Sequence, residues 1–115
     1  MTYMLLILEP PGQRATRTDA QGRAAYQRML EYAADLRRRG ALVAADALKT
    51  AGVRFTPQAG GPQRLDGPFA ESKELIGGFF LIDAPTQEEA LVLARACPAT
   101  EWATVEVREI GTCYE

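Results

Sequence analysis

The sequence predicts an α+β fold for a chain of 115 residues. Three observations lead to this prediction. Two segments carry helix-capping patterns, short apolar segments lie before, between and after them, and a glycine-rich turn interrupts the middle of the chain. The resulting order is β-α-β-(hairpin)-β-α-β. A chain of this length fits one domain spanning residues 1–115, because a second core would leave each half too small to bury enough apolar surface.

The first strand and the first helix have clear predicted boundaries. Tyr3–Glu9 is a short apolar run, and the polar loop Pro10–Thr18 that follows opens with two prolines and a glycine. Thr18 and Gln21 have the spacing of a capping box, and Gly40 provides the stop signal. Between them one apolar stripe recurs at helical spacing: Tyr26, Met29, Leu30, Ala33 and Leu36.

Three further segments are predicted to be extended. Ala41–Leu48 is small and apolar, as expected for a second strand. Val53–Thr56 and Gln63–Leu65 flank the turn Gly60-Gly61-Pro62 and suggest a hairpin. Glu74–Asp83 contains consecutive apolar residues, which predict a strand that is apolar on both faces.

The last third of the chain repeats the helix–strand order. Thr86–Glu89 has the form of a second capping box and opens a helix through about Ala96, and Pro98 prevents its continuation. Thr104–Arg108 alternates polar and apolar residues, as a half-buried strand does.

Two helices that connect the strands of a mainly antiparallel sheet predict a ferredoxin-like plait. The helices can cover only one face of such a sheet, yet Met4–Leu8 and Phe79–Ile82 are apolar at consecutive positions and so on both faces. A monomer would then expose a large apolar patch, which is rare in soluble proteins. The pattern therefore predicts a homodimer that packs sheet against sheet.

Composition excludes several classes of function. The net charge is −2, and the basic run Arg37-Arg38-Arg39 falls at a predicted helix end, where cations complement the helix dipole. We therefore expect no nucleic-acid partner and no binding to anionic membranes. No segment approaches the ~20 apolar residues needed to span a bilayer, and Met4–Leu8 is too short for a signal-peptide core. A cytoplasmic location is expected.

The chain offers little for metal or cofactor chemistry. It contains no histidine, and Cys97 and Cys113 have no metal-ligand spacing. Buried or idle thiols are the expected state of both cysteines in a reducing compartment. Cys97 lies at a predicted helix C-terminus, where the dipole disfavours a thiolate. No cofactor motif is present, so we expect no cofactor.

Three stretches resemble the YCII-related (DGPF-domain) family: Tyr3–Ile7, the run Asp66–Glu74 followed by Gly77-Gly78-Phe79, and Val105–Arg108. The resemblance implies a dimeric α+β barrel with a cleft at the edge of the sheets. Some wider relatives use a His-Asp pair, and a dehydrochlorinase is the enzyme precedent. Asp66 matches the family aspartate, but this chain has no histidine to partner it. In some bacteria, family members accompany alternative sigma factors. The resemblance therefore also allows a competing function, that of a non-catalytic accessory module.

Asp66 is the first candidate site residue. In an apolar cleft its carboxylate could serve as a general acid or base. The alternative is structural, because Asp66-Gly67-Pro68 has the residue types of a turn in which the carboxylate accepts nearby backbone N–H groups.

Three other residues are candidates for ligand binding. Phe69 could form the wall of a pocket or belong to the core, and Lys73 could bind an acidic ligand or lie in a solvated loop. Tyr3 and Arg108 are expected on outer strands and could reach a cleft, although exposed strand positions are the default for both. The pair Gly77-Gly78 is expected to mark a bulge or a close backbone approach. Two functions thus stay open: a small-molecule or enzymatic cleft near Asp66, and an accessory module.

Overall fold

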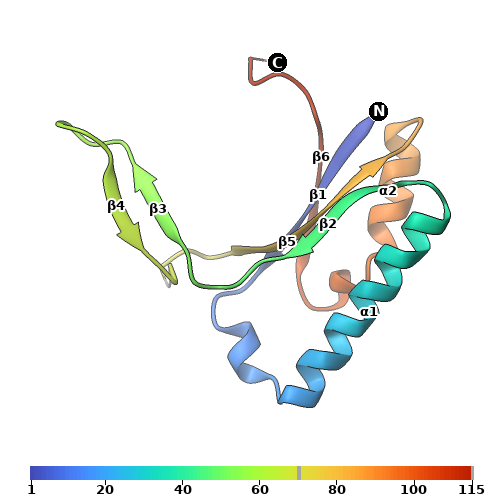
Figure 1. Cartoon of the computed structure of the whole chain (residues 1–115), viewed down its shortest axis with the longest axis horizontal. Helices are drawn as coiled ribbons and strands as arrows, with labels where there is room; N and C mark the ends of the chain where they lie inside the picture. Colours follow the sequence, from blue (N-terminus) through green and yellow to red (C-terminus); the bar gives the residue numbers. More distant parts are fainter. Residues whose placement is uncertain (70, 115) are drawn as a thin grey trace.

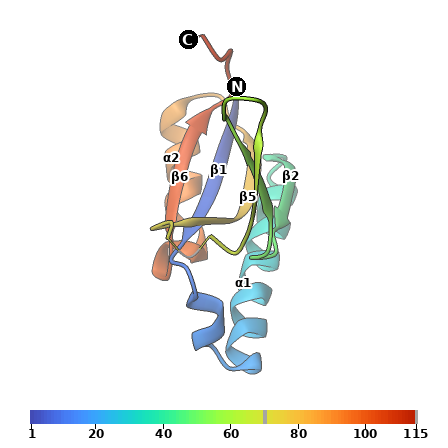
Figure 2. The same cartoon turned by 90° about the vertical axis from the view of Figure 1, so that its left-hand side faces the viewer.

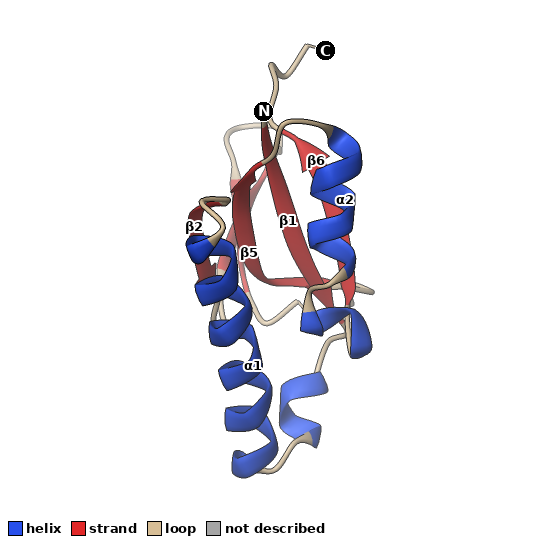
Figure 3. Cartoon of the chain, turned by 90° about the vertical axis from the view of Figure 1, so that its right-hand side faces the viewer, coloured by secondary structure: helices blue, strands red, loops and turns tan. Residues whose placement is uncertain are grey.

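The computed structural model describes residues 1–69 and 71–114. Its main sheet has four antiparallel strands in the order β2-β5-β1-β6. The strands of this sheet are β1 (Thr2–Glu9), β2 (Leu42–Ala47), β5 (Leu75–Asp83) and β6 (Thr104–Glu109). Both α-helices, α1 (Asp19–Arg38) and α2 (Gln87–Arg95), cover the same face of this sheet (Figure 3). The predicted α+β, ferredoxin-like plait is confirmed.

Local signals explain where the two helices begin and end. The Thr18 side chain accepts a hydrogen bond from the Gln21 backbone, and the Gln21 side chain accepts one from the Thr18 backbone, so the predicted capping box is present in both directions. Gly40 follows α1 with a φ of 72°, a left-handed conformation that glycine adopts at no steric cost. At the start of α2, Thr86 accepts a hydrogen bond from the Glu89 backbone.

Two short 3-10 helices were not predicted. The segment expected to be a polar loop contains η1 (Gln13–Thr16), and Pro98, expected only to end the second helix, opens η2 (Pro98–Glu101). Gln13 joins the two segments, because its side-chain amide donates a hydrogen bond of 2.6 Å to the Trp102 carbonyl oxygen. This hydrogen bond ties the loop after β1 to the segment between α2 and β6. In Figure 3 the η1 segment lies beside the first turns of α1.

The core lies between the main sheet and the two helices. Alternate residues of β1 are buried, from Tyr3 to Glu9, because this strand is central and hydrogen bonds to both β5 and β6. The expectation that Tyr3 lies on an outer strand is therefore wrong: it is 1% exposed and faces the helices. Tyr32 of α1 packs edge-on against Phe80 of β5, with ring centroids 5.1 Å apart.

The opposite face of the sheet is apolar and is not covered by a helix. Met4 and Leu6 of β1 stand opposite Leu81 and Phe79 of β5, and all four side chains are half-buried in the single chain. Ile76, further along β5, is 52% exposed. The prediction that these strands are apolar on both faces is confirmed.

The central hairpin forms a sheet of its own. The strands β3 (Val53–Thr56) and β4 (Gln63–Asp66) pair only with each other within the described residues. We call residues 53–66 the arm. It projects from the body on the side of the main sheet that the helices leave open (Figures 1 and 2). The radius of gyration is 15.9 Å, against about 13 Å for a compact chain of this length, and the projecting arm contributes to the difference.

Candidate functional site

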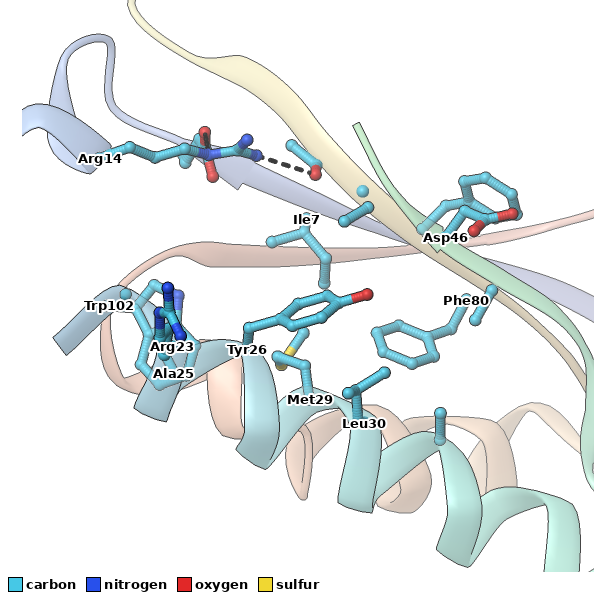
Figure 4. Close-up of a pocket in the computed structure, with 18 of the residues that line it drawn as sticks. Ile7, Arg14, Arg23, Ala25, Tyr26, Met29, Leu30, Asp46, Phe80 and Trp102 are labelled. Atoms are coloured by element: carbon cyan, nitrogen blue, oxygen red, sulfur yellow. Dashed lines mark hydrogen bonds and ion pairs between the residues drawn. The ribbon is translucent and has the colours of Figure 1, made fainter. Parts of the chain in front are cut away.

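A groove of about 700 Å³ lies between the first half of α1 and the main sheet. It exists because α1 contacts the core with its second half, where Tyr32 and Leu36 are buried, whereas Tyr26 and Leu30 are 55% and 44% exposed. The apolar stripe predicted along this helix is present, and the part of it in the first half of the helix lines the groove. The apolar part of the lining includes Ile7, Met29, Leu30 and Phe80 (Figure 4), and also Ala33.

An ion pair with a buried carboxylate and a partly exposed arginine lies at the end of the groove nearest η1. The Arg14 Nε atom is 2.8 Å from Glu9 Oε1, and the Glu9 side chain is only 8% exposed. Arg14 also donates to the carbonyl oxygens of Leu48, at 2.7 Å, and of Gly77, at 3.1 Å. The arginine thus links the loop after β1 to the end of β2 and the beginning of β5 (Figure 4).

Gly77 leaves the space that this ion pair occupies. A Cβ atom on Gly77 would lie 2.6 Å from Glu9 Cδ and 3.0 Å from Arg14 Nη2, closer than real Cβ contacts allow. The pairing of β1 with β5 shifts at the same place, between Ile7 and Leu8. At the next residue, a Cβ on Gly78 would lie 2.9 Å from the Asp46 carbonyl oxygen. The predicted bulge and close backbone approach at this glycine pair are both confirmed.

Polar and charged groups surround the opening of the groove. Tyr26 extends from α1 across the groove, with its hydroxyl group directed toward the sheet (Figure 4). Arg23 pairs with Asp19 at 3.0 Å, and both side chains are solvent-exposed. The Arg17 guanidinium lies over the Trp102 ring, with its carbon 5.5 Å from the ring centroid. An apolar floor with a few polar groups at one end is the usual composition of a small-molecule site.

The Asp66 side chain lies at the end of the arm strand β4 and not in the groove. It is 71% exposed, and its Oδ1 atom accepts a hydrogen bond of 3.0 Å from Arg64 Nε. The backbone N–H partners expected for a turn carboxylate are absent among the described residues. A role for Asp66 as an acid or base stays a prediction.

The residues after Asp66 close the base of the arm. A Cβ on Gly67 would lie 2.8 Å from the Phe69 ring, so the ring packs directly over this glycine. The Arg54 guanidinium carbon stands 3.7 Å from the centroid of the same ring, and Arg54 also donates to Ser72. These contacts give Phe69 a packing role in this chain.

The other sequence candidates are not in the groove either. Lys73 is exposed beyond the base of the arm, and Tyr3 is in the core. Cys97 is buried as expected, and burial raises the pKa of its thiol, so it is a poor nucleophile, whereas Cys113 is exposed. Across residues 1–69 and 71–114, no three His, Cys, Asp or Glu side chains group as a metal would require. Within the same ranges, every helix is too short or too polar to cross a membrane.

Sequence reasoning missed Glu9, Arg14 and Tyr26. One signal for Glu9 was available: it continues the inward alternation of Tyr3, Leu5 and Ile7, so its carboxylate had to face the core side of the sheet. A buried carboxylate requires a partner. Nothing local in the sequence identifies that partner as Arg14, which reaches back from the loop.

The fold and the groove define an α+β plait protein with a site between its first helix and its sheet. The family model for the YCII-related domain matches residues 1–112, and the chain belongs to this family. An uncharacterized protein of Rhizobium meliloti (strain 1021) is 43% identical over 66 residues, which are 54% of this chain and 52% of that protein. The match thus spans about half the length of that relative.

One solved structure is similar over nearly the whole chain. It is 5-chloro-2-hydroxyhydroquinone dehydrochlorinase from Burkholderia phenoliruptrix AC1100, in complex with 2,5-dihydroxybenzoquinone. The TM-score is 0.54, the likeness covers 96% of this chain and 94% of the other, and the identity is 16%. At this identity the likeness establishes a shared fold and no shared chemistry.

Proposed function

We propose that this chain is a homodimeric small-molecule-binding protein whose ligand lies in the groove between α1 and the main sheet. The observation that carries the proposal is the groove itself, which has about 700 Å³ of space, an apolar floor and the buried Glu9–Arg14 pair at one end. This volume is within the range of small-molecule sites, about 300–1,000 Å³.

The apolar floor favours a flat, mostly apolar ligand body. Met29 and Leu30 come from α1, and Ile7 and Phe80 come from the sheet, so a planar ring would contact apolar side chains on two sides. The dehydrochlorinase with the same fold is solved with a dihydroxybenzoquinone, which makes six-membered ring compounds reasonable first probes. Because the chain lacks histidine, imidazole acid–base chemistry is not part of the proposal.

The dimer is supported by the open face of the sheet and by the arm. Met4, Leu6, Phe79 and Leu81 form an apolar surface that neither helix covers. The arm stands on this same side of the sheet (Figures 1 and 2). An isolated two-stranded sheet is only marginally stable in water, so an arm of this kind gains stability from packing on another surface. A second copy of the chain would cover both.

A thermal-shift screen tests the ligand proposal. The purified chain is screened against metabolites that include ring compounds with hydroxyl, carbonyl or carboxylate groups. A ligand present at 100 times its Kd should add about 2.7 kcal/mol to the free energy of unfolding. Failure of every ring compound to stabilise the protein would count against the proposal.

The exposed arm favours one second candidate, an accessory module that binds another protein. Phe55 is 70% exposed and Val53 is 48% exposed, and both lie in strand β3. Such a surface is available to a regulatory partner if a second copy does not occupy it. A chain that is monomeric in solution and gives no hit in the ligand screen would favour this function.

A further inference from the structure

Building on the proposed groove function, we propose that Glu9 and Arg14 together are the recognition site for the polar edge of the ligand. That edge carries a hydrogen-bond donor next to an acceptor, as in a cyclic amide or a hydroxy-carbonyl compound. Glu9 accepts from the donor, and Arg14 donates to the acceptor.

The burial of the ion pair is the first argument. The Glu9 side chain is 8% exposed and that of Arg14 is 38% exposed. Taking a carboxylate out of water is costly, and apolar residues in place of such a pair often stabilise a protein. Both residues line the groove, and a few polar groups in a mostly apolar groove are the usual means of orienting a small ligand.

Unused hydrogen-bonding capacity is the second argument. Glu9 Oε1 pairs with Arg14 Nε at 2.8 Å, and a carboxylate has about four lone-pair sites, more than this one contact uses. Arg14 uses Nε, Nη1 and Nη2 once each, for Glu9, Leu48 and Gly77. A guanidinium group has five N–H bonds, so two remain available. The pair therefore offers an acceptor and donors side by side.

Gly77 is the third argument, because its missing side chain maintains this arrangement. Any larger residue would displace the Glu9 carboxylate and the Arg14 guanidinium group. Gly77 also accepts a hydrogen bond from Arg14 through its carbonyl oxygen, at 3.1 Å. The pairing of β5 with β1 is irregular at Gly77, and a glycine in a strand contributes no side-chain packing. What the glycine provides instead is space for a charged pair at the end of the groove.

Two matched probes test the proposal by NMR titration of the full chain. The first is 2-pyridone, a flat ring with an N–H group next to a carbonyl group, and the second is N-methyl-2-pyridone, which lacks the donor. We expect 2-pyridone to shift the signals of Glu9, Arg14 and Tyr26 at millimolar concentration. N-methyl-2-pyridone should bind at least tenfold more weakly, because Glu9 would lose its hydrogen-bond donor.

Three variants make the test specific. Glu9→Gln removes the charged acceptor and keeps the shape, and it should abolish the preference for 2-pyridone. Gly77→Ala should have the same effect, because the added methyl group displaces the Glu9–Arg14 ion pair. This variant replaces Glu9→Gln in the test if Glu9→Gln does not fold. Glu88→Gln, an exposed position in the first turn of α2, is the control and should keep the preference.

The outcomes separate this inference from the proposed function. If both probes shift the groove signals equally, or if Glu9→Gln and Gly77→Ala keep the preference, the recognition role is overturned while the groove remains a ligand site. If neither probe shifts signals of the groove and the metabolite screen also gives no hit, both proposals fail together.

Discussion

Arg14 and Gly77 are 63 residues apart in the sequence, and a hydrogen bond of 3.1 Å joins the Arg14 guanidinium group to the Gly77 carbonyl oxygen. The contact fastens the loop after β1 to the beginning of β5. The same guanidinium group neutralises Glu9, so one side chain both holds the loop and forms the polar end of the groove. If the proposed function is correct, stability and ligand binding therefore both depend on Arg14.

Arg14→Met should destabilise the fold because it leaves the Glu9 carboxylate buried and unpaired. We expect a loss of about 2 kcal/mol in the free energy of unfolding, less than for a fully buried pair because water reaches the Arg14 side. Urea denaturation measures the loss. The matched control is Arg23→Met, which breaks the exposed pair with Asp19 and should cost less than about 0.5 kcal/mol. Equal losses in the two variants would show that the Glu9–Arg14 pair has no special role.

The pair between Arg28 and Glu101 predicts a dependence of stability on pH. The hydrogen bond from Arg28 holds the pKa of Glu101 below its usual value of 4.5. A lowered pKa in the folded state means that the pair stabilises the fold above pH 4.5 and that this contribution is lost as the pH falls through the folded pKa.

The variant Glu101→Gln tests this expectation. Its urea midpoint should lie below that of the parent at pH 7, and the difference should shrink progressively as the pH falls below 4.5. Added salt should narrow the difference at pH 7, because both side chains are largely exposed. A difference that persists unchanged at pH 3 would rule out the ion pair as its cause.

Light scattering tests the proposed dimer. The parent chain should have twice the 12.6 kDa mass of one chain at micromolar concentration. Leu6→Asp introduces a charge on the open face of the sheet and should give the monomer mass. Val92→Asp, at a 70% exposed position of α2, is the control and should remain dimeric. A monomeric parent chain would mean that the open apolar face is not covered by a second copy.

Asp66 is tested separately from the groove. Its ion pair with Arg64 is exposed, so Asp66→Ala should change stability by less than about 1 kcal/mol. Asp66→Asn removes the charge and keeps the size. Because the arm holds this residue away from the groove of its own chain, a loss of ligand binding in Asp66→Asn would require that the arm of a second copy supplies it. Unchanged binding in Asp66→Asn would leave Asp66 without the predicted role.

Local signals in the sequence were sufficient for most of the fold. The Thr18–Gln21 capping box and Gly40 located α1, and the pair Gly77-Gly78 indicated the bulge in β5. Residues that depend on distant partners were harder to place. Nothing near Arg14 indicates that it reaches Leu48 and Gly77 across the molecule.

The candidate site was predicted less well for two physical reasons. The stripe that contains Tyr26 and Leu30 has core spacing, but only tertiary packing decides that α1 contacts the sheet with its second half. Asp66 is the last residue of a hairpin whose strands pair only with each other in the described chain. The sequence does not show that this hairpin leaves the main sheet. The sequence therefore could not show that Asp66 lies outside the groove of its own chain.

Calorimetric titration of a groove-filling variant tests the central claim most directly. Leu30 lines the groove and is 44% exposed, and Leu91 is a matched position on α2 at 45% exposure outside it. The best ligand from the thermal-shift screen is titrated into the parent chain, Leu30→Trp and Leu91→Trp. We expect binding to weaken at least tenfold in Leu30→Trp, because the indole ring fills the groove, and to remain unchanged in Leu91→Trp. Equal affinity for all three proteins would contradict the claim that the ligand lies between α1 and the sheet.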